Sequence, residues 1–390
     1  MDKNKLKAIA VVAAALLALP CASASETAKN AAAKNVDISK IDRNFAAAKI
    51  DVEKPVFKNA LEAPFVLEGF PWLAENGGEL YRIPKTTTAK ETNGGVIHLA
   101  SNTAGGVVRF RTDSPFLVLR ARLTNPNFRV GHMPDTGASG FDLFHNGAKV
   151  YLATVNPAKT LKKNSDVIEA QLVNFKKSQM RDYTLYLPLY NGVKTLEIGV
   201  SADAKFLPPP EHKVKKPVLF YGSSITQGAC ASRPANAYTA MLCRAVDAPM
   251  INLGFSGSAR GEKKMAELIA SLDLSVFVFD YDHNAPSLEH LQKTHEPFFK
   301  IIRKAHPDLP IIILGKIIPA PHPRDNVLKT TYENAVKAGD KKVWYIPSKE
   351  LMKGLDFAYF TVDNCHPTDL GFYFMFKNTL PVLKEALKSK

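Results

Sequence analysis

Short apolar runs alternate with segments of helical spacing over the second half of the chain. The runs are four to six residues long and largely apolar, as is typical of strands buried on both faces of a parallel sheet. They lie at residues 218–221, 250–255, 276–281, 311–314 and 343–346. Helical spacing occurs at residues 238–246, 265–272, 298–305 and 370–387. This alternation predicts an α/β fold, with helices on both faces of a parallel sheet.

A different pattern covers residues 65–200, where short β-type runs are separated by glycine and Asn-Gly turn signals. The runs are GGVIHLAS, GGVVRFRT, FLVLRARL, DYTLYLPLY and TLEIGV, and we expect each to be a strand. Together they predict an all-β sandwich with the connectivity of a jelly roll. Its aromatic side chains could stack on sugar rings, but packing in the core is the commoner fate of aromatics in a sandwich. They are Trp72, Tyr81, Phe144, Tyr186 and Tyr190.

A proline-rich segment separates the two patterns. Phe206-Leu207-Pro208-Pro209-Pro210 and the charged residues that follow predict a stiff, extended linker. At 390 residues the chain is long enough for two hydrophobic cores. We therefore expect a β-sandwich domain at residues 56–205, a linker at 206–216 and an α/β domain at 217–390.

The first residues have the pattern of an export signal. Three lysines precede an apolar run at residues 8–19, and small residues after it predict cleavage behind Ala24. The run is too short to span a bilayer. We expect a signal peptide at residues 1–24, a low-complexity tether at 25–55, and a periplasmic or secreted protein. Cys21 leaves lipoprotein anchoring as an alternative, which the proline before it disfavours.

The formal charge of +14 is spread along the chain and accompanies no nucleic-acid-binding motif. Nucleic acid is therefore a weak interpretation. A simpler explanation is that the excess of lysine keeps the protein soluble or attracts it to acidic polymers.

Candidate chemistry begins where the strand at residues 218–221 ends. Ser223, Ser224 and Thr226 lie between two glycines, and a helical segment follows, so the unit is strand, sharp turn, helix. A serine at such a turn projects at the carboxyl edge of the sheet, where ligands bind and backbone N–H groups can stabilise an anion. The alternative is that these hydroxyls only cap the helix and turn the chain.

Three later segments reach the same edge, because each follows a predicted strand or closes the domain. NLGFSGSARGE provides Gly257, where a backbone N–H can approach a reacting oxygen. FDYDHNAPS provides Asn284, a neutral donor. VDNCHPTDLG places Asp363 three residues before His366, so that the carboxylate can orient the imidazole as a general base. Each has a bland explanation alone, as a turn glycine, a helix cap, a surface charge and a loop histidine.

The order of these segments resembles the SGNH hydrolases, the GDSL-like lipases and acylhydrolases. GSSITQG looks like their first block, with Ser224 in the nucleophile position, and DNCHPTDLG looks like their last, which carries Asp363 and His366. Gly257 and Asn284 match the glycine and asparagine of the middle blocks. The resemblance implies a flavodoxin-like parallel sheet and hydrolysis of an ester through an acyl-enzyme, with an oxyanion hole formed by Ser224, Gly257 and Asn284.

The first half adds to the resemblance. TAGGVVRFRT, GFDLF at residues 140–144 and RDYTLYLPLYNGV resemble the β-rich GxDLY domain that precedes an SGNH domain in one bacterial branch. Three departures stand out: Ser223 replaces the aspartate of GDSL, Phe144 replaces the tyrosine of GxDLY, and Asp282-His283-Asn284-Ala285 lacks the glycine and aspartate of the usual GxND block. The last change leaves open how the amide of Asn284 is held, and Asp282 or His283 could line the pocket instead.

The resemblance implies no metal or organic cofactor. For an exported enzyme with a β-sandwich, it favours O-acetyl groups on a polysaccharide or sugar as the substrate. Lipid or aryl esters are the alternative, which the lack of an apolar lid in the sequence disfavours. A third hypothesis is a carbohydrate-binding protein whose esterase site has decayed.

After cleavage of the signal peptide three cysteines would remain, Cys230, Cys243 and Cys365, without metal-ligand spacing. If the triad forms, Cys230 and Cys365 come within reach of each other, and a disulfide between them could pin the two catalytic loops together. Three buried, reduced thiols are the alternative.

Overall fold

The computed structural model describes residues 38–42, 49–161, 165–318 and 322–389. The predicted signal peptide and Cys21 lie outside these residues, and of the predicted tether α2 (Ile38–Ile41) is described as a short helix. The described residues from 49 to 389 form one compact unit. Within the described ranges, no helix has both the length and the apolar character needed to cross a membrane.

A five-stranded parallel sheet forms the centre of the C-terminal half. Its strands are β11 (Val218–Gly222), β12 (Met250–Gly254), β13 (Val276–Asp280), β14 (Ile311–Leu314) and β15 (Val343–Ile346). The order is β12-β11-β13-β14-β15, which is the 2-1-3-4-5 order of flavodoxin-like folds. The α/β prediction is confirmed, and the carboxyl edge of β11 becomes the switch point at which such folds bind ligands.

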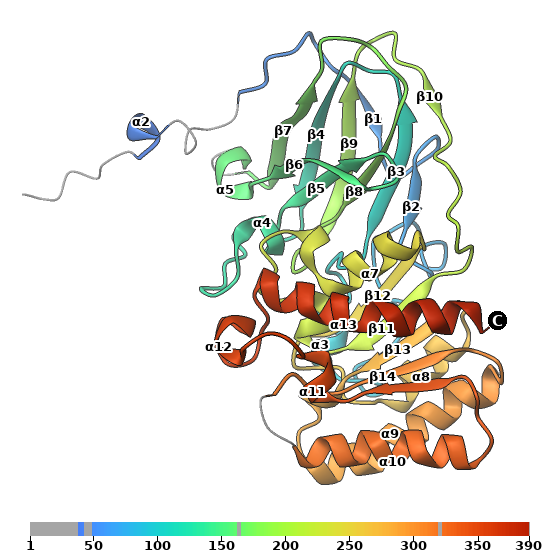
Figure 1. Ribbon diagram of the computed structural model, residues 1–390. Coiled ribbons are helices and arrows are strands. Elements are labelled where there is room, and N and C mark those ends of the chain that lie inside the picture. Colours follow the sequence, from blue (N-terminus) through green and yellow to red (C-terminus); the bar gives the residue numbers. More distant parts are fainter. Residues whose placement is uncertain (1–37, 43–48, 162–164, 319–321, 390) are drawn as a thin grey trace, which may run out of the picture. The chain divides into compact units, whose positions relative to one another are not determined.

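Helices cover both faces of this sheet (Figure 1). One face packs against α7 (Tyr238–Val246) and α13 (Asp369–Lys388), and the other against α8 (Lys263–Ala270), α9 (Leu288–Ala305) and α10 (Pro323–Lys337). Side chains of β11 alternate between the two layers, with Phe220 in the first core and Tyr221 in the second. The sequence pattern did not predict α10, whose exposed face is polar over most of its length.

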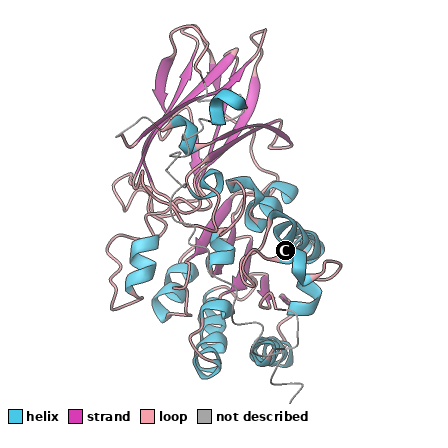
Figure 2. Cartoon of the chain, turned by 90° about the vertical axis from the view of Figure 1, so that its left-hand side faces the viewer, coloured by secondary structure: helices cyan, strands magenta, loops and turns pink. Residues whose placement is uncertain are grey.

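Residues 56–207 form two antiparallel sheets, visible as the strand-rich part of Figure 2. One contains β1 (Val56–Asn59), β9 (Val193–Val200), β4 (Phe116–Leu123) and β7 (Val167–Asn174). The other contains β10 (Phe206–Leu207), β3 (Val107–Thr112), β8 (Arg181–Tyr186), β5 (Phe141–His145) and β6 (Val150–Val155), with β2 (Val66–Glu68) paired to β3. The sandwich is confirmed, and its jelly-roll connectivity stays a prediction. Trp72, Phe144, Tyr186 and Tyr190 are buried, as expected of core aromatics.

One predicted strand is wrong. GGVIHLAS is not a strand but contains the helix α3 (Gly94–Leu99). The side chain of Asn93 caps it by accepting hydrogen bonds from the N–H groups of Gly95 and Val96. Val96 and Ala100, four residues apart, lie on one face and are fully buried against the parallel-sheet layer. A six-residue helix contains too few turns for its spacing to be distinguished from a strand.

The sandwich and the parallel-sheet layer share a hydrophobic core. Val107, Tyr186 and Leu189 of the sandwich belong to the same buried cluster as Val218 and Tyr238 of the other half. Burial of this surface against the α7 side therefore stabilises both halves together. The domain boundary at residues 206–216 stays a prediction.

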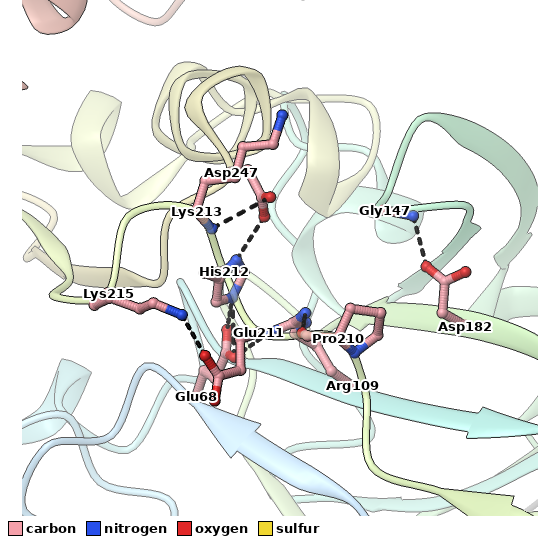
Figure 3. A network of polar contacts seen from close by, with 10 residues as sticks. All are labelled: Glu68, Arg109, Gly147, Asp182, Pro210, Glu211, His212, Lys213, Lys215 and Asp247. Carbon is pink, nitrogen blue, oxygen red and sulfur yellow. Dashed lines mark hydrogen bonds and ion pairs between the residues drawn. The ribbon is translucent and has the colours of Figure 1, made fainter.

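The linker is held at His212, between the two halves (Figure 3). His212 Nδ1 lies 2.8 Å from Asp247 Oδ1, at the end of α7, and Nε2 lies 3.1 Å from both carboxylate oxygens of Glu68 on β2. Arg109 of β3 pairs with Glu68 at 3.0 Å and donates to the carbonyl of Pro210. The linker is thus fixed to both layers by polar contacts that are largely buried.

Replacing His212 by alanine should lower the free energy of unfolding by about 1–3 kcal/mol, because Glu68 and Asp247 lose a shared partner. Denaturant titration of the purified variant measures this. His98→Ala, at an exposed position on α3, is the control and should change stability by less than about 0.5 kcal/mol. Equal stability of the two variants would show that the linker contact contributes nothing.

Candidate active site

The turn after β11 places Ser224 at the first position of a short helix, α6 (Ser224–Gln227). Ser223 caps this helix, because its hydroxyl accepts a hydrogen bond from the N–H of Ile225. Gly222 leaves no room for a side chain: a Cβ there would lie 2.1 Å from Thr226 Oγ1 and 2.4 Å from the carbonyl oxygen of Asp280. The strand therefore passes into the helix within one residue, and Ser224 stands at the carboxyl edge of the sheet.

The structure brings Ser224, His366 and Asp363 into one chain of contacts. Ser224 Oγ lies 2.9 Å from His366 Nε2, and His366 Nδ1 lies 2.7 Å from Asp363 Oδ2. The second carboxylate oxygen of Asp363 accepts hydrogen bonds from the backbone N–H groups of Cys365 and His366, at 3.1 and 2.7 Å. The carboxylate therefore fixes both the imidazole and the turn that carries it.

Asp363 stays ionised in this setting. Partial burial raises its pKa, but hydrogen bonds from the backbone and the ring of His366 outweigh burial and hold that pKa below its usual value. A carboxylate at Nδ1 favours the tautomer whose Nε2 has a free lone pair. That lone pair faces the hydroxyl of Ser224, as a general base must.

The assignment of Gly257 and Asn284 to an oxyanion hole stays a prediction, and the structure shows the contacts that each of them makes. Gly257 has a φ of 64° and open space at the position of a Cβ, and its carbonyl oxygen accepts hydrogen bonds from the guanidinium of Arg260. Asn284 Nδ2 donates to the carbonyl oxygen of Phe255 at 2.9 Å, which ties the two segments together. None of the hydrogen bonds between described residues uses the backbone N–H of Ser224 or of Gly257. Two such free donors at the edge of the sheet can bind a developing oxyanion.

Arg324 holds the segment Asp282-His283-Asn284-Ala285, which lacks the glycine and aspartate of the usual GxND block. Its guanidinium, on α10, donates to the carbonyl oxygens of Asp282 and Ala285, at 2.5 and 2.8 Å. The short 3₁₀ helix η3 (Asp282–Asn284) is thereby fixed by a side chain from α10. His283 Nε2 accepts the N–H of Ile317, and burial with the nearby cations holds its pKa well below the usual range, so this histidine is neutral.

Asp282 is buried, with no hydrogen bond to either carboxylate oxygen from the described part of the chain. It therefore points into the protein rather than lining a pocket. Burial, together with the nearby carboxylate of Asp280, raises the pKa of Asp282 to about 8. Asp280 itself accepts hydrogen bonds from Thr226 and Tyr238 and holds the nucleophile turn.

Replacing Asp282 by asparagine should raise the free energy of unfolding by about 1–3 kcal/mol at pH 8. At pH 5 the gain in stability should be smaller. The folded state keeps a proton on Asp282 up to a pH of about 8, whereas an unfolded aspartate loses it near about 4. Wild-type stability therefore falls as the pH rises between these values. Denaturant unfolding at several pH values measures the slope. The control Asp203→Asn, at an exposed position, should show the wild-type dependence of stability on pH. If Asp282→Asn also showed the wild-type dependence, Asp282 would not be the group responsible for it.

The sandwich makes contacts with the site that the sequence did not reveal. Tyr190 donates its hydroxyl proton to the carbonyl of Ser224 at 3.1 Å, and Gln227 Nε2 donates to the carbonyl of Leu189 at 3.1 Å. His132 packs beside His366, with ring centroids 5.4 Å apart, and its Nε2 lies 3.9 Å from Asp363 Oδ2. No motif pointed to His132, because its loop has neither periodicity nor a catalytic neighbour in sequence.

Asp142, in the GxDLY-like motif, holds the loop that follows the nucleophile turn. It is fully buried and accepts hydrogen bonds from the N–H of Ala235, from Thr154 and from Arg233. Burial raises its pKa, and these donors offset part of that effect. The motif's aspartate could have been singled out from the sequence, but its partner could not.

Arg82, from the N-terminal half, holds the backbone just before the Gly257 segment. Its guanidinium is fully buried and donates to the carbonyl oxygens of Asn252 and Gly254, at 3.1 and 2.6 Å, while lying over the ring of Phe255. Burial lowers the pKa of Arg82 to about 9. The end of β12, from which the Gly257 segment departs, is thus anchored by the N-terminal half.

All three described cysteines are free thiols, and the alternative of three buried thiols holds for two of them. Cys230 and Cys243 are buried, and Cys365 is partly exposed.

Residues 215–384 match the profile of the GDSL-like lipase/acylhydrolase family, and residues 56–206 match that of the N-terminus of Esterase_SGNH_hydro-type proteins, named GxDLY. No curated protein matches the chain. A crystal structure from Bacteroides ovatus, assigned as a GDSL-like lipase, is 31% identical, covers 86% of this chain and 98% of its own, and superposes with a TM-score of 0.74.

Two more distant structures share the fold. The salicylyl-acyltransferase SsfX3 from a tetracycline biosynthetic pathway is 19% identical, with a TM-score of 0.70, and covers 86% of this chain and 98% of its own. A family two carbohydrate esterase from Clostridium thermocellum, solved with cellohexaose, is 14% identical, with a TM-score of 0.56, and covers 74% of this chain and 94% of its own.

Proposed function

The chain belongs to the GDSL-like lipase/acylhydrolase family, and from this premise we propose that it is an exported serine esterase that removes O-acetyl groups from carbohydrate. Hydrolysis of an ester bond is the family's reaction. What we add is the identity of the catalytic residues, the O-acetylated carbohydrate as substrate, and export from the cell. The observation that carries it is the contact chain from Ser224 through His366 to Asp363.

In the proposed reaction His366 takes the proton of Ser224 as the serine oxygen attacks the ester carbonyl. The tetrahedral oxyanion lies between the backbone N–H groups of Ser224 and Gly257 and the amide of Asn284. His366 then gives the proton to the leaving alcohol, and an acyl-enzyme forms on Ser224. Water, deprotonated by His366, releases the acid and restores the serine.

Polar groups beside the triad support a hydrophilic substrate. His132 is 38% exposed next to His366, and the guanidinium of Arg260 donates to the carbonyl oxygen of Gly257 from the exposed side. Such groups suit the hydroxyls of a sugar better than an acyl chain. The fold shared with a carbohydrate esterase solved with cellohexaose is consistent with this choice.

A second candidate substrate is a lipid ester, which exposed apolar side chains favour. Four of them flank the catalytic loop, on α12 (Phe357–Phe360), on the loop itself and on α13: Tyr359, Val362, Leu370 and Tyr373. The sequence pattern did not reveal this exposure. The apolar pair Val362 and Leu370 would suit an acyl chain, whereas the two tyrosines could also stack on sugar rings.

Hydrolysis rates of the purified protein test the proposal. We expect turnover of p-nitrophenyl acetate, faster release of acetate from acetylated xylan than from a detergent-dispersed triglyceride, and a rate that falls as the acyl chain of p-nitrophenyl esters lengthens. A rate that rises with chain length would assign the enzyme to lipids. No hydrolysis of any ester would favour a carbohydrate-binding protein with a decayed site.

A further inference from the structure

Three side chains able to bind a metal converge beside the proposed triad. His132, Cys230 and His366 each present one ligand atom, and these atoms lie within 4.8 Å of one another. They come from separate segments: a loop of the sandwich, the loop after α6 and the catalytic loop. Their spacing in the sequence conceals the cluster, because more than a hundred residues separate Cys230 from His366.

His366 makes the contact with a carboxylate that orients many metal-binding histidines, and its other nitrogen, Nε2, faces Ser224 Oγ. Its Nδ1 contacts Asp363 Oδ2 at 2.7 Å, so the free lone pair is on Nε2. Histidines that bind zinc usually make this same contact with a carboxylate, which fixes the ring and makes the ligating nitrogen more basic.

We propose that His132, Cys230 and His366 form an inhibitory site for a thiophilic divalent cation such as Zn²⁺. Two imidazoles and one thiolate are a ligand set that Zn²⁺ favours, and three protein ligands leave a fourth position for water or for Ser224 Oγ. Zn–N bonds of about 2.0–2.1 Å and a Zn–S bond of about 2.3 Å require ligand atoms roughly 3.3–3.8 Å apart. The cluster must therefore contract by about 1 Å. His132 has room for this movement, because its side chain is 38% exposed.

Binding exchanges one proton for the metal. Cys230 is buried, and burial, with the nearby Asp363 and Cys365, raises its pKa to about 12, so the free residue is a thiol. On binding, the S–H bond breaks, a sulfur–metal bond forms, and the proton passes to solvent. The carboxylate of Asp363 balances part of the added positive charge.

Occupation of the site would stop the proposed reaction at its first step. The lone pair on His366 Nε2 would be shared with the metal and could not accept the proton of Ser224. The cation would also join the sandwich loop to the catalytic loop through His132. Inhibition should therefore need one metal ion per chain and be reversed by a chelator.

Cobalt(II) titration of the purified, reduced protein tests binding without any need for turnover. A thiolate bound to Co²⁺ gives a charge-transfer absorption band in the near ultraviolet. We expect this band in the wild type, its loss in Cys230→Ser, and at least about tenfold weaker binding in His132→Gln. The matched controls are Cys243→Ala, a buried thiol that lines the cavity beside His212, and His98→Gln, an exposed histidine on α3; both should keep the band.

Inhibition by Zn²⁺ supplies the second measurement, with each variant compared with its own metal-free rate. The concentration for half inhibition should rise at least about tenfold in Cys230→Ser and in His132→Gln, and stay unchanged in the two controls. A wild type without the cobalt band, or with equal inhibition in Cys230→Ser, would overturn the site. Because the cobalt measurement needs no substrate, failure of the proposed esterase function would leave it interpretable.

Discussion

Replacing Ser224 by alanine is expected to lower kcat by roughly 10⁴- to 10⁶-fold while leaving the fold intact. Ser224 is buried at the turn, but its hydroxyl makes its one hydrogen bond among the described residues with His366, and loss of a single oxygen removes little packing. Without the oxygen no acyl-enzyme can form. Steady-state hydrolysis of p-nitrophenyl acetate, with circular dichroism as a check on folding, measures the effect.

Ser223→Ala is the matched control. It shares the turn and also loses a hydroxyl, but that hydroxyl caps α6 rather than facing His366. The change should cost about 1 kcal/mol of stability and leave turnover within a few-fold of the wild type. If Ser224→Ala kept near-normal turnover, or if Ser223→Ala lost as much, the nucleophile would be assigned wrongly.

Replacing His366 by alanine should cost almost as much as the loss of Ser224, because the two side chains act as a unit. The variant retains the serine but has no group within 3 Å of its oxygen to accept the proton. Single-turnover measurement of acyl-enzyme formation separates this step from product release. Acylation at the wild-type rate would exclude His366 as the base.

Asp363→Asn should be milder, with a loss of roughly 10² to 10⁴ in kcat. The amide oxygen can still accept the two backbone hydrogen bonds of the turn, so the loop should keep its shape. The amide can, however, present an N–H to His366 Nδ1 and favour the wrong tautomer. A loss as large as that of His366→Ala would indicate that the loop itself had collapsed.

The fold could be predicted from the sequence wherever burial decided the pattern. The strand at residues 311–314 lies with all four residues in the core, and an uninterrupted apolar run specifies it fully. The strand predicted at residues 94–99 was wrong because a six-residue helix is too short to show helical spacing in its apolar residues. Its capping residue, Asn93, also resembles a turn signal. α10 was missed because its buried residues are few, namely Leu328, Thr331 and Ala335.

The candidate site divides in the same way. Ser224, Gly257, Asn284, Asp363 and His366 follow strand ends or close the fold, and the rule that such ends share one edge brings them together. Residues that support them from the other half obey no such rule. Arg82 and Asp142 act on backbone groups, and any segment can supply those. Only the three-dimensional contact shows which segment does so.

The core shared between the sandwich and the α7 side has a consequence for how the molecule loses its structure. Because Val107 and Tyr186 are buried in the same cluster as Val218, neither half can open without exposing apolar surface of the other. We therefore expect a single calorimetric transition instead of two. We also expect excision of residues 1–216 to leave a fragment that aggregates, because it would expose the apolar surface that the sandwich covers.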